Sequence, residues 1–347
     1  MGRRAGGDPS IGLEESWYFS TANSSSNRET LSESTQVDVC IVGAGYTGLS
    51  AAIELASHGY SVTVLESHRV GAGASGRNGG VLGSGQRKDQ DELERWLGPD
   101  DARHMWQIAC DANQLVRDRI AQYGIQCDLK DGELTVAHKE RHAPELWEYA
   151  EHLDKTYGYT DMRAVDRQEA FDILGVDSFY GGYVDARAGH IHPFNLALGL
   201  ASAAEKQGAQ IYEQTRVTDY RQVADRVKVN TAHGTVTARF MIMACNGYLG
   251  RLEPGAERYQ MPINNFILAT EPLGEDRARS INRDDLAVVD TRFVVNYFHN
   301  SPDHRLIFGG GENYSSRFPS DIKKFVRKNM LEVYPQLADV RIDYAWG

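Results

Sequence analysis

The chain has 347 residues, of which 41% are hydrophobic and 24% charged, values typical of a folded globular protein long enough for two domains. Its formal net charge of −11 argues against nucleic acid or an anionic membrane surface as the main partner. No stretch is apolar for long enough to span a membrane, so we expect a cytoplasmic protein.

Residues 1–35 form the first predicted segment, an N-terminal extension rich in Ser, Gly, Asn and Glu. Arg3 and Arg4 are not followed by an apolar run, so neither a secretory nor a twin-arginine signal is expected. Three adjacent aromatic residues, Trp17, Tyr18 and Phe19, interrupt the polar composition, and such a group usually docks onto a folded surface.

The stretch 37–66 has the pattern of a dinucleotide-binding βαβ unit. An apolar run at 37–42 leads into Gly43, Gly45 and Gly48 in G-x-G-x-x-G spacing, a small-residue helix follows, and a second apolar run ends at Glu66. The glycines permit a tight turn, close approach of a pyrophosphate and close helix packing, and the helix N-terminus offers free N–H groups. Glu66 is placed to accept hydrogen bonds from ribose hydroxyls.

Residues 67–86 contain seven glycines and cannot form a regular element. Because Arg77 and Asn78 stand among the glycines, we favour a loop that wraps a ligand over a flexible linker.

The next hundred residues mix helices with short strands. Helical spacing of apolar residues predicts helices at 100–123, 141–157 and 166–174. A hairpin is expected at 125–129 and 132–137, with its turn at 130–132, and a strand at 181–185.

From residue 189 the chain reads GHIHP, then a helix at 194–207 and alternating strands at 210–220, 226–231 and 234–237. The run FMIMA at 240–244 suits a buried parallel strand and ends in CNGY. Strands at 264–270, 286–289, 292–298 and 306–309, a helix at 320–334 and a strand at 340–346 complete the prediction.

This order predicts an α/β fold in which a Rossmann-like nucleotide-binding domain is assembled from separate segments around an inserted α+β substrate domain with a mainly antiparallel sheet. We assign 36–86, 187–248 and 335–347 to the nucleotide-binding domain, and 87–186 and 249–334 to the substrate domain. The cysteines are widely spaced, so we expect free thiols and no metal site: Cys40, Cys110, Cys127 and Cys245.

Together, the βαβ unit, GAGASGRNGG, GHIHP and MACNGY resemble the D-amino-acid-oxidase-type FAD-dependent oxidoreductases, over residues 17–347. Within that family the chain is most similar to the gamma-glutamylputrescine oxidoreductase branch, through Trp17-Tyr18, GYTGLSAA, GASGRNGG and IFGGG. The resemblance implies FAD as cofactor. It also implies a family segment beyond Gly347, which closes the FAD-binding domain.

The resemblance implies a set of FAD-contacting residues along the chain. The ADP half would lie against Gly43, Ala44, Gly45, Gly48 and Glu66, with Val217 touching adenine through its backbone. The remaining contacts would come from the glycine-rich loop and the CNGY segment: Ser75, Gly76, Arg77, Asn78, Gly79, Gly80, Ala244, Cys245, Asn246 and Gly247.

The implied chemistry is hydride removal from a carbon that bears an amine, followed by imine hydrolysis and reoxidation by O2. Arg77 is the one catalytic candidate, as a cation beside the flavin ring, although a phosphate or structural contact is an equal alternative. His190 and His192 are expected to be structural. The oligomeric state is not predicted.

Two alternatives remain open. Sarcosine, glycine or D-amino-acid substrates would need a cation for their carboxylate, for which Arg251, Arg258 and Arg292 are candidates. The chain could also be a non-catalytic FAD- or nucleotide-binding remnant.

Overall fold

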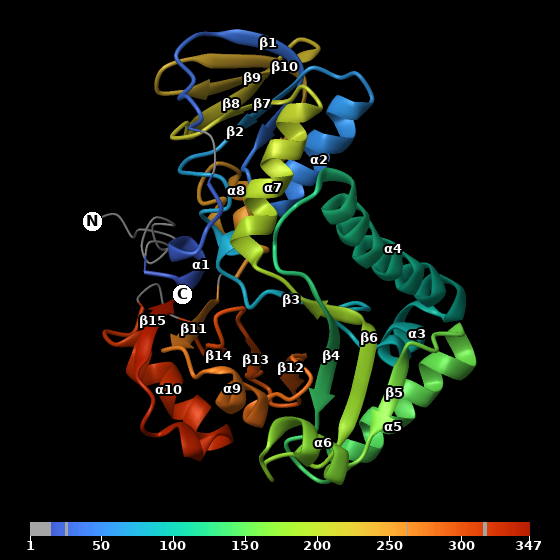
Figure 1. The fold of residues 1–347 in the computed structure, drawn as a ribbon. Helices are drawn as coiled ribbons and strands as arrows, with labels where there is room; N and C mark the ends of the chain where they lie inside the picture. Colours follow the sequence, from blue (N-terminus) through green and yellow to red (C-terminus); the bar gives the residue numbers. More distant parts are fainter. Residues whose placement is uncertain (1–14, 25–26, 262, 315–317) are drawn as a thin grey trace.

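The computed structural model describes residues 15–24, 27–261, 263–314 and 318–347, and the first fourteen residues of the predicted extension lie outside that range. The described chain builds two sheets joined by long crossovers. In Figure 1 the smaller sheet lies at the top and the larger one at the bottom, with the end of the chain close to α1 (Trp17–Ser20) between them.

The smaller sheet has six strands in the order β7-β2-β1-β10-β9-β8. The strands β7, β2, β1 and β10 are mutually parallel, whereas β9 and β8 continue the sheet in antiparallel fashion. Their bounds are β1 (Thr35–Val42), β2 (Val62–Leu65), β7 (Gln210–Tyr212), β8 (Val217–Val223), β9 (Arg226–Thr231) and β10 (Thr235–Met243). The Rossmann-like prediction is therefore confirmed, with β10 as the returning strand.

Two helices, α2 (Tyr46–Ser57) and α7 (Pro193–Lys206), cover one face of this sheet (Figure 1). Their small residues allow close packing, because Ala52 and Ala201 are both fully buried in the core that contains Ile41 and Val64. His192 begins α7 by accepting a hydrogen bond from the backbone N–H of Asn195.

The larger sheet has nine strands, and every described pairing in it is antiparallel except that of β4 with β12. The main order is β15-β11-β14-β13-β12-β4-β6-β3, and β5 pairs with β6. The strands are β3 (Val81–Leu82), β4 (Lys130–Val136), β5 (Met162–Val165), β6 (Gly182–His190), β11 (Asn264–Thr270), β12 (Ala287–Asp290), β13 (Tyr297–Asn300), β14 (Leu306–Asn313) and β15 (Ile342–Trp346).

One face of the nine-stranded sheet is a closed hydrophobic core. Leu134, Val288, Phe298 and Phe308 point to this side and are fully buried under α6 (Arg167–Leu174), α9 (Glu275–Ile281) and α10 (Ile322–Val333). Near β6, the remaining large helices are α3 (Gln90–Leu97), α4 (Pro99–Tyr123) and α5 (His142–His152), and the short α8 (Pro254–Glu257) follows the smaller sheet (Figure 1).

On the opposite face of this sheet, a row of residues crosses the strands, and those from Tyr297 to Tyr183 are half-buried. The register pairs Ile267 with Gly309, Gly309 with Tyr297, and Tyr297 with Val289. It continues by pairing Val289 with Thr135, and Thr135 with Tyr183. These residues therefore lie side by side across six strands, on the face that the core helices leave uncovered.

The aromatic N-terminal segment docks between the two sheets. Tyr18 is fully buried, with its ring 5.2 Å from that of Trp346 and 5.0 Å from that of His192. Ser16 caps α1 by accepting a hydrogen bond from the N–H of Phe19. The expected docking of the aromatic group is confirmed.

Three local predictions were wrong. The hairpin at 125–137 does not form, because 130–136 is the single strand β4, which pairs with β6 and β12. The segment 210–220 is two strands, β7 and β8. The run at 240–244 is parallel to β1 as expected, but β9 pairs with β10 only as far as Ala238, and Phe240 just beyond is 57% exposed.

The predicted domain boundaries remain a proposal, which the strand pairings lead us to amend. Residues 342–346 were grouped with the FAD-binding domain, yet they form β15, which pairs with β11 in the nine-stranded sheet. We therefore propose that this last strand belongs with the substrate domain.

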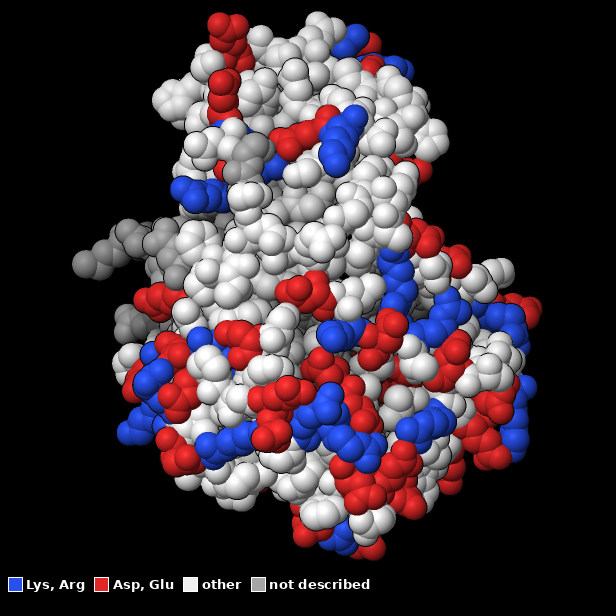
Figure 2. Space-filling model, viewed as in Figure 1, with Lys and Arg blue, Asp and Glu red and all other residues white. Residues whose placement is uncertain are grey.

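Charged side chains of both signs are interspersed on the face shown in Figure 2, most densely over the lower half of the molecule. Within the described ranges, no helix combines the length and apolarity needed to cross a membrane.

Candidate functional site

The glycine turn after β1 is packed against the returning strand β10. Gly43 has a φ of +106°, which favours glycine, and a Cβ there would lie 2.7 Å from the carbonyl oxygen of Ala244. A Cβ at Gly48 would overlap the carbonyl oxygen of Gly43, so only glycine lets α2 begin this close to the turn. No side chain caps α2 at Gly45.

Glu66, at the end of β2, closes the turn from the other side. Its Oε2 accepts a hydrogen bond from the backbone N–H of Ala44 over 2.8 Å, and its Oε1 accepts one from that of His68 over 2.9 Å. The Ser67 hydroxyl also donates to Oε1 over 3.2 Å. A carboxylate oxygen can accept two hydrogen bonds, so Oε2 keeps capacity for a ligand.

The loop at 67–86 folds back onto the start of α2. The Ser75 hydroxyl accepts a hydrogen bond from the N–H of Tyr46 over 3.0 Å, and the N–H of Gly71 donates to the carbonyl of Ala44. Asn78 holds the loop in shape, because its amide donates to the carbonyls of Ala74 and Ser75 and accepts from the N–H of Gly80. The loop that was predicted to wrap a ligand is thus held in a defined shape by these hydrogen bonds. We call its residues 71–80 the arc.

Arg77 lies where this arc meets the nine-stranded sheet. It is 5% exposed, and its guanidinium donates to the carbonyl of Ala72 over 2.8 Å and to that of Gly347 over 3.0 Å. The indole of Trp346 donates to the backbone carbonyl of Arg77.

The CNGY segment lies beside the glycine turn, as its predicted role requires. The N–H of Ala244 donates to the carbonyl of Val42 over 2.8 Å, and the Cys245 thiol contacts the same oxygen at 3.5 Å. Burial, and secondarily Glu66, raise the pKa of Cys245 to about 11, so this thiol is protonated at neutral pH. Val217 begins β8 in the core beneath the carboxyl end of β2.

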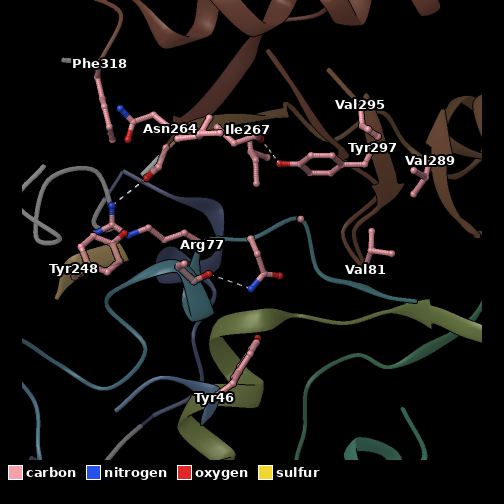
Figure 3. Close-up of a pocket in the computed structure, with 16 residues that line it drawn as sticks. Tyr46, Arg77, Val81, Tyr248, Asn264, Ile267, Val289, Val295, Tyr297 and Phe318 are labelled. Carbon is pink, nitrogen blue, oxygen red and sulfur yellow. Dashed lines mark hydrogen bonds between the residues drawn. The ribbon is translucent and has the colours of Figure 1, made fainter. Parts of the chain in front are cut away.

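A cavity of about 610 Å³ opens between the arc and the nine-stranded sheet (Figure 3). Its walls come from both halves of the molecule, with Tyr46 and Tyr248 from the nucleotide side and Val289 and Tyr297 from the sheet. Figure 3 shows Tyr248 and Phe318 at one end and Val81 and Val289 at the other. The lining also includes Arg77, Asn78, Gly79, Asn265, Val295 and Gly347.

Tyrosine and amide groups supply most of the polarity of this cavity. The Tyr297 hydroxyl donates to Asn265 over 2.6 Å, and the Tyr46 hydroxyl donates to the carbonyl of Pro193 over 2.9 Å. Burial raises the pKa of both phenols well above the ordinary value, so both are neutral. Gly79 lies directly against the Tyr297 ring, where a Cβ would not fit.

Among the described lining residues, Arg77 is the single cationic side chain. Arg251 and Arg258 are exposed, and Arg292 forms an ion pair with Asp290 away from the cavity. The three arginines proposed as carboxylate partners are therefore not in the cavity wall.

The two histidines of GHIHP line a second cavity of about 420 Å³ beside α1. The rings of His190 and His299 are stacked with centroids 4.3 Å apart. Burial lowers the pKa of His190 to about 4, of His192 to about 4 and of His299 to about 3. All three are neutral above pH 6, and their hydrogen bonds to Asp285, Asn195 and Asn300 support the structural interpretation.

The chain belongs to a family of FAD-dependent oxidoreductases, since residues 38–347 match the family model described as "DAO: FAD dependent oxidoreductase". Among curated proteins, it is 39% identical to gamma-glutamylputrescine oxidoreductase of Escherichia coli over 95% of this chain and 78% of that protein. It is 40% identical to a probable oxidoreductase OrdL of Rhizobium meliloti, over 96% and 77% of the two chains.

Solved structures support the fold. Glycine oxidase from Geobacillus kaustophilus superposes with a TM-score of 0.73 at 20% identity, over 90% of this chain and 81% of that one. L-proline dehydrogenase from P. horikoshii gives 0.69 at 20% identity, over 91% and 81%.

The residues present fit FAD. The N-terminus of α2, where the N-cap residue Gly45 has no side chain, and the glycine turn form a cradle that a side chain would fill, and they face the arc at 71–80. The arc then leads into the cavity beside Arg77, which can take a bulky ring.

Sequence reasoning missed the cavity wall on the sheet side. Tyr297, Asn265, Val289 and Val295 carry no motif, and only the sheet register brings them together. Tyr46 was read as part of the GYTG motif alone, although a tyrosine at the start of the binding helix was an available signal.

Proposed function

We propose that the protein oxidises an amine of the gamma-glutamylputrescine type. When bound, FAD would accept a hydride from the carbon that bears the amine. The resulting imine hydrolyses to an aldehyde and ammonia, and O2 takes the two electrons to give H2O2. The similarity to the Escherichia coli enzyme supports this substrate class and a role in putrescine catabolism. The four free cysteines suit the reducing conditions of the cytoplasm.

We assign the cofactor contacts as the sequence analysis did. The turn at Gly43, Ala44, Gly45 and Gly48 would hold the pyrophosphate, with Glu66 on the ribose and Val217 near adenine. The arc and the CNGY segment would follow the rest of the cofactor: Ser75, Gly76, Arg77, Asn78, Gly79, Gly80, Ala244, Cys245, Asn246 and Gly247. Their meeting around one cradle supports this assignment.

The composition of the cavity wall is the observation that favours an amine over an α-amino acid. A substrate carboxylate next to the reacting carbon needs a cationic partner. Arg77 is the single cation in the described wall, and its guanidinium already bonds to Ala72 and Gly347.

The other lining groups would prepare the amine for oxidation. An amine must be neutral to lose hydride, and Val289, Val295 and Ile267 make a largely apolar wall that disfavours its charged form. Tyr297 and Asn265 offer hydrogen-bonding groups that can orient it.

The test is anaerobic bleaching of the flavin in the purified, FAD-loaded protein. We expect putrescine and its acylated derivatives to bleach the flavin and, with air, to release H2O2. Bleaching by glycine, sarcosine or D-alanine alone would instead favour the amino-acid oxidases. A chain that binds FAD and is bleached by neither group would be the non-catalytic remnant.

A further inference from the structure

The row of residues that crosses the nine-stranded sheet from Ile267 to Tyr183 continues past the cavity. Tyr297 and Val289 line the cavity, and Thr135 and Tyr183 follow on the next two strands. All four side chains are half-buried although they lie on interior strands. The wall therefore has a direct extension toward β6.

Glu133 lies on this extension. It is two residues before Thr135 on β4, on the same face, and it pairs with Asp185 of β6 and Ala287 of β12. From strand spacing and rise, the Cα atoms of Glu133 and Tyr297 are roughly 12 Å apart.

A second path leads from the cavity to the same carboxylate. Val81 lines the cavity, and Gly83 lies two residues further along. The Oε2 atom of Glu133 is 3.4 Å from where a Cβ of Gly83 would be, so the carboxylate lies against this backbone. Figure 3 shows Val81 and Val289 at the same end of the cavity. Both routes to Glu133 start from this end, one through Val289 and Thr135 on β4 and the other through Val81 and Gly83.

The surroundings of Glu133 suit a cation. The Glu133 carboxylate accepts a hydrogen bond from the Thr135 hydroxyl, but it forms no ion pair with any Lys, Arg or His of the described chain. Asp185 is already engaged by the Tyr159 hydroxyl over 2.7 Å and by the N–H of Arg187 over 3.0 Å. Among the described residues, the Thr135 hydroxyl is the donor to Glu133 and it reaches Oε1, so the Oε2 atom of Glu133 has unused capacity.

Two aromatic rings complete the environment. The rings of Tyr149 and Tyr183 lie 6.2 Å apart, and the Glu133 charge contributes to the raised pKa of Tyr183, after burial. Aromatic faces attract ammonium groups, so these rings, of which Tyr183 lies one strand away from Glu133, can add to the attraction of the carboxylate. Burial and the charge of Asp185 raise the pKa of Glu133 to about 7. A bound cation would stabilise the ionised carboxylate and lower this pKa.

We propose that Glu133, with Tyr183 and Tyr149, binds a second ammonium group of the substrate, at the far end of the chain from the carbon that is oxidised. The proposal rests on the amine oxidation proposed above and narrows its substrate to amines with two separated positive charges. A monoamine would occupy the cavity and leave Glu133 without a partner.

The experiment compares α,ω-diamines with n-alkylamines of equal length on the FAD-loaded protein at about pH 8, where most Glu133 is ionised. We expect the wild type to prefer diamines, increasingly so for longer chains. Glu133→Gln should lower kcat/KM for diamines by about tenfold or more, through KM, and leave n-alkylamines unchanged. Glu133→Asp should restore part of the preference, and Glu140→Gln, at an exposed glutamate, is the matched control.

Binding without turnover separates the two proposals. Long diamines should raise the Tm of the wild type and not that of Glu133→Gln. If diamines bind in this manner but no amine bleaches the flavin, amine oxidation fails and the ammonium site stands. If amines bleach the flavin with equal kcat/KM for both series, or if Glu133→Gln retains the diamine preference, the ammonium site is overturned.

Discussion

The indole N–H of Trp346 donates a hydrogen bond to the backbone carbonyl of Arg77 over 2.9 Å, although the two residues are 269 positions apart. This contact fastens β15, at the edge of the nine-stranded sheet, to the glycine-rich arc of the nucleotide half. The arc that we assign to FAD is therefore held in part by the substrate side of the molecule.

Trp346→Phe should destabilise the protein by about 1–3 kcal/mol, because the buried carbonyl of Arg77 loses its donor. We expect FAD to be retained more weakly as well, since the arc loses an anchor. Urea unfolding and titration with FAD measure the two effects. Trp96→Phe is the control, because Trp96 is 61% exposed, and equal losses in both variants would contradict the prediction.

Gly48→Ala should abolish FAD binding, because the added methyl group overlaps the carbonyl oxygen of Gly43 and pushes α2 away from the turn. Ser57→Ala, at the exposed end of the same helix, should bind FAD normally. Flavin absorbance after gel filtration reports retention, and circular dichroism shows whether the variant is folded. A folded Gly48→Ala protein with normal FAD content would refute the assigned cradle.

Arg77→Lys tests the one catalytic candidate. Lysine keeps the charge but cannot reproduce the planar fork that reaches Ala72 and Gly347. We expect slower reoxidation of the flavin by O2, by about tenfold, with a smaller effect on its reduction by amine. Stopped-flow spectroscopy separates the two half-reactions. If only FAD affinity changes, Arg77 is a structural contact.

Because three histidines are buried, we expect the free energy of unfolding to fall in acid. His190, His192 and His299 have folded-state pKa values lowered to about 4, 4 and 3, below the ordinary value of about 6.5. Below pH 6.5 the unfolded chain binds more protons than the folded chain, so the free energy of unfolding decreases as pH falls from 6.5 toward 4.

Each such histidine contributes up to about 1.4 kcal/mol per pH unit to this slope. Urea unfolding at several pH values measures it. His299→Asn should give a shallower slope than the wild type, even if its absolute stability is lower. An equal slope in the wild type and in His299→Asn would contradict the assignment.

The nucleotide half of the molecule could be predicted from local sequence patterns. The turn at Gly43, the acid at Glu66 and the arc around Arg77 are each encoded within a few residues, and the structure places them together. The cavity wall was not predictable in this way. Tyr297 and Val289 reach it only through pairings between strands, and register across a sheet depends on contacts that are distant in sequence.

The wrong hairpin at 125–137 has the same cause. Lys130, Asp131 and Gly132 have the composition of a turn, but β4 gains more by pairing with β6 and β12 than by folding on its neighbour. The tertiary sheet overrides the local turn preference, with Gly132 at an irregularity in the β4–β6 register.

The pairing of β1 with β10 sets an order of events during protein synthesis. Thr35 aligns with Val236 and Val42 with Met243, so the strand that emerges first from the ribosome has to wait for a partner made much later. Until translation passes Met243, β1 and β2 expose a hydrophobic sheet edge while the entire intervening chain is being produced. Such high contact order slows folding and favours protection by chaperones, so the nucleotide half, though first in sequence, is completed late.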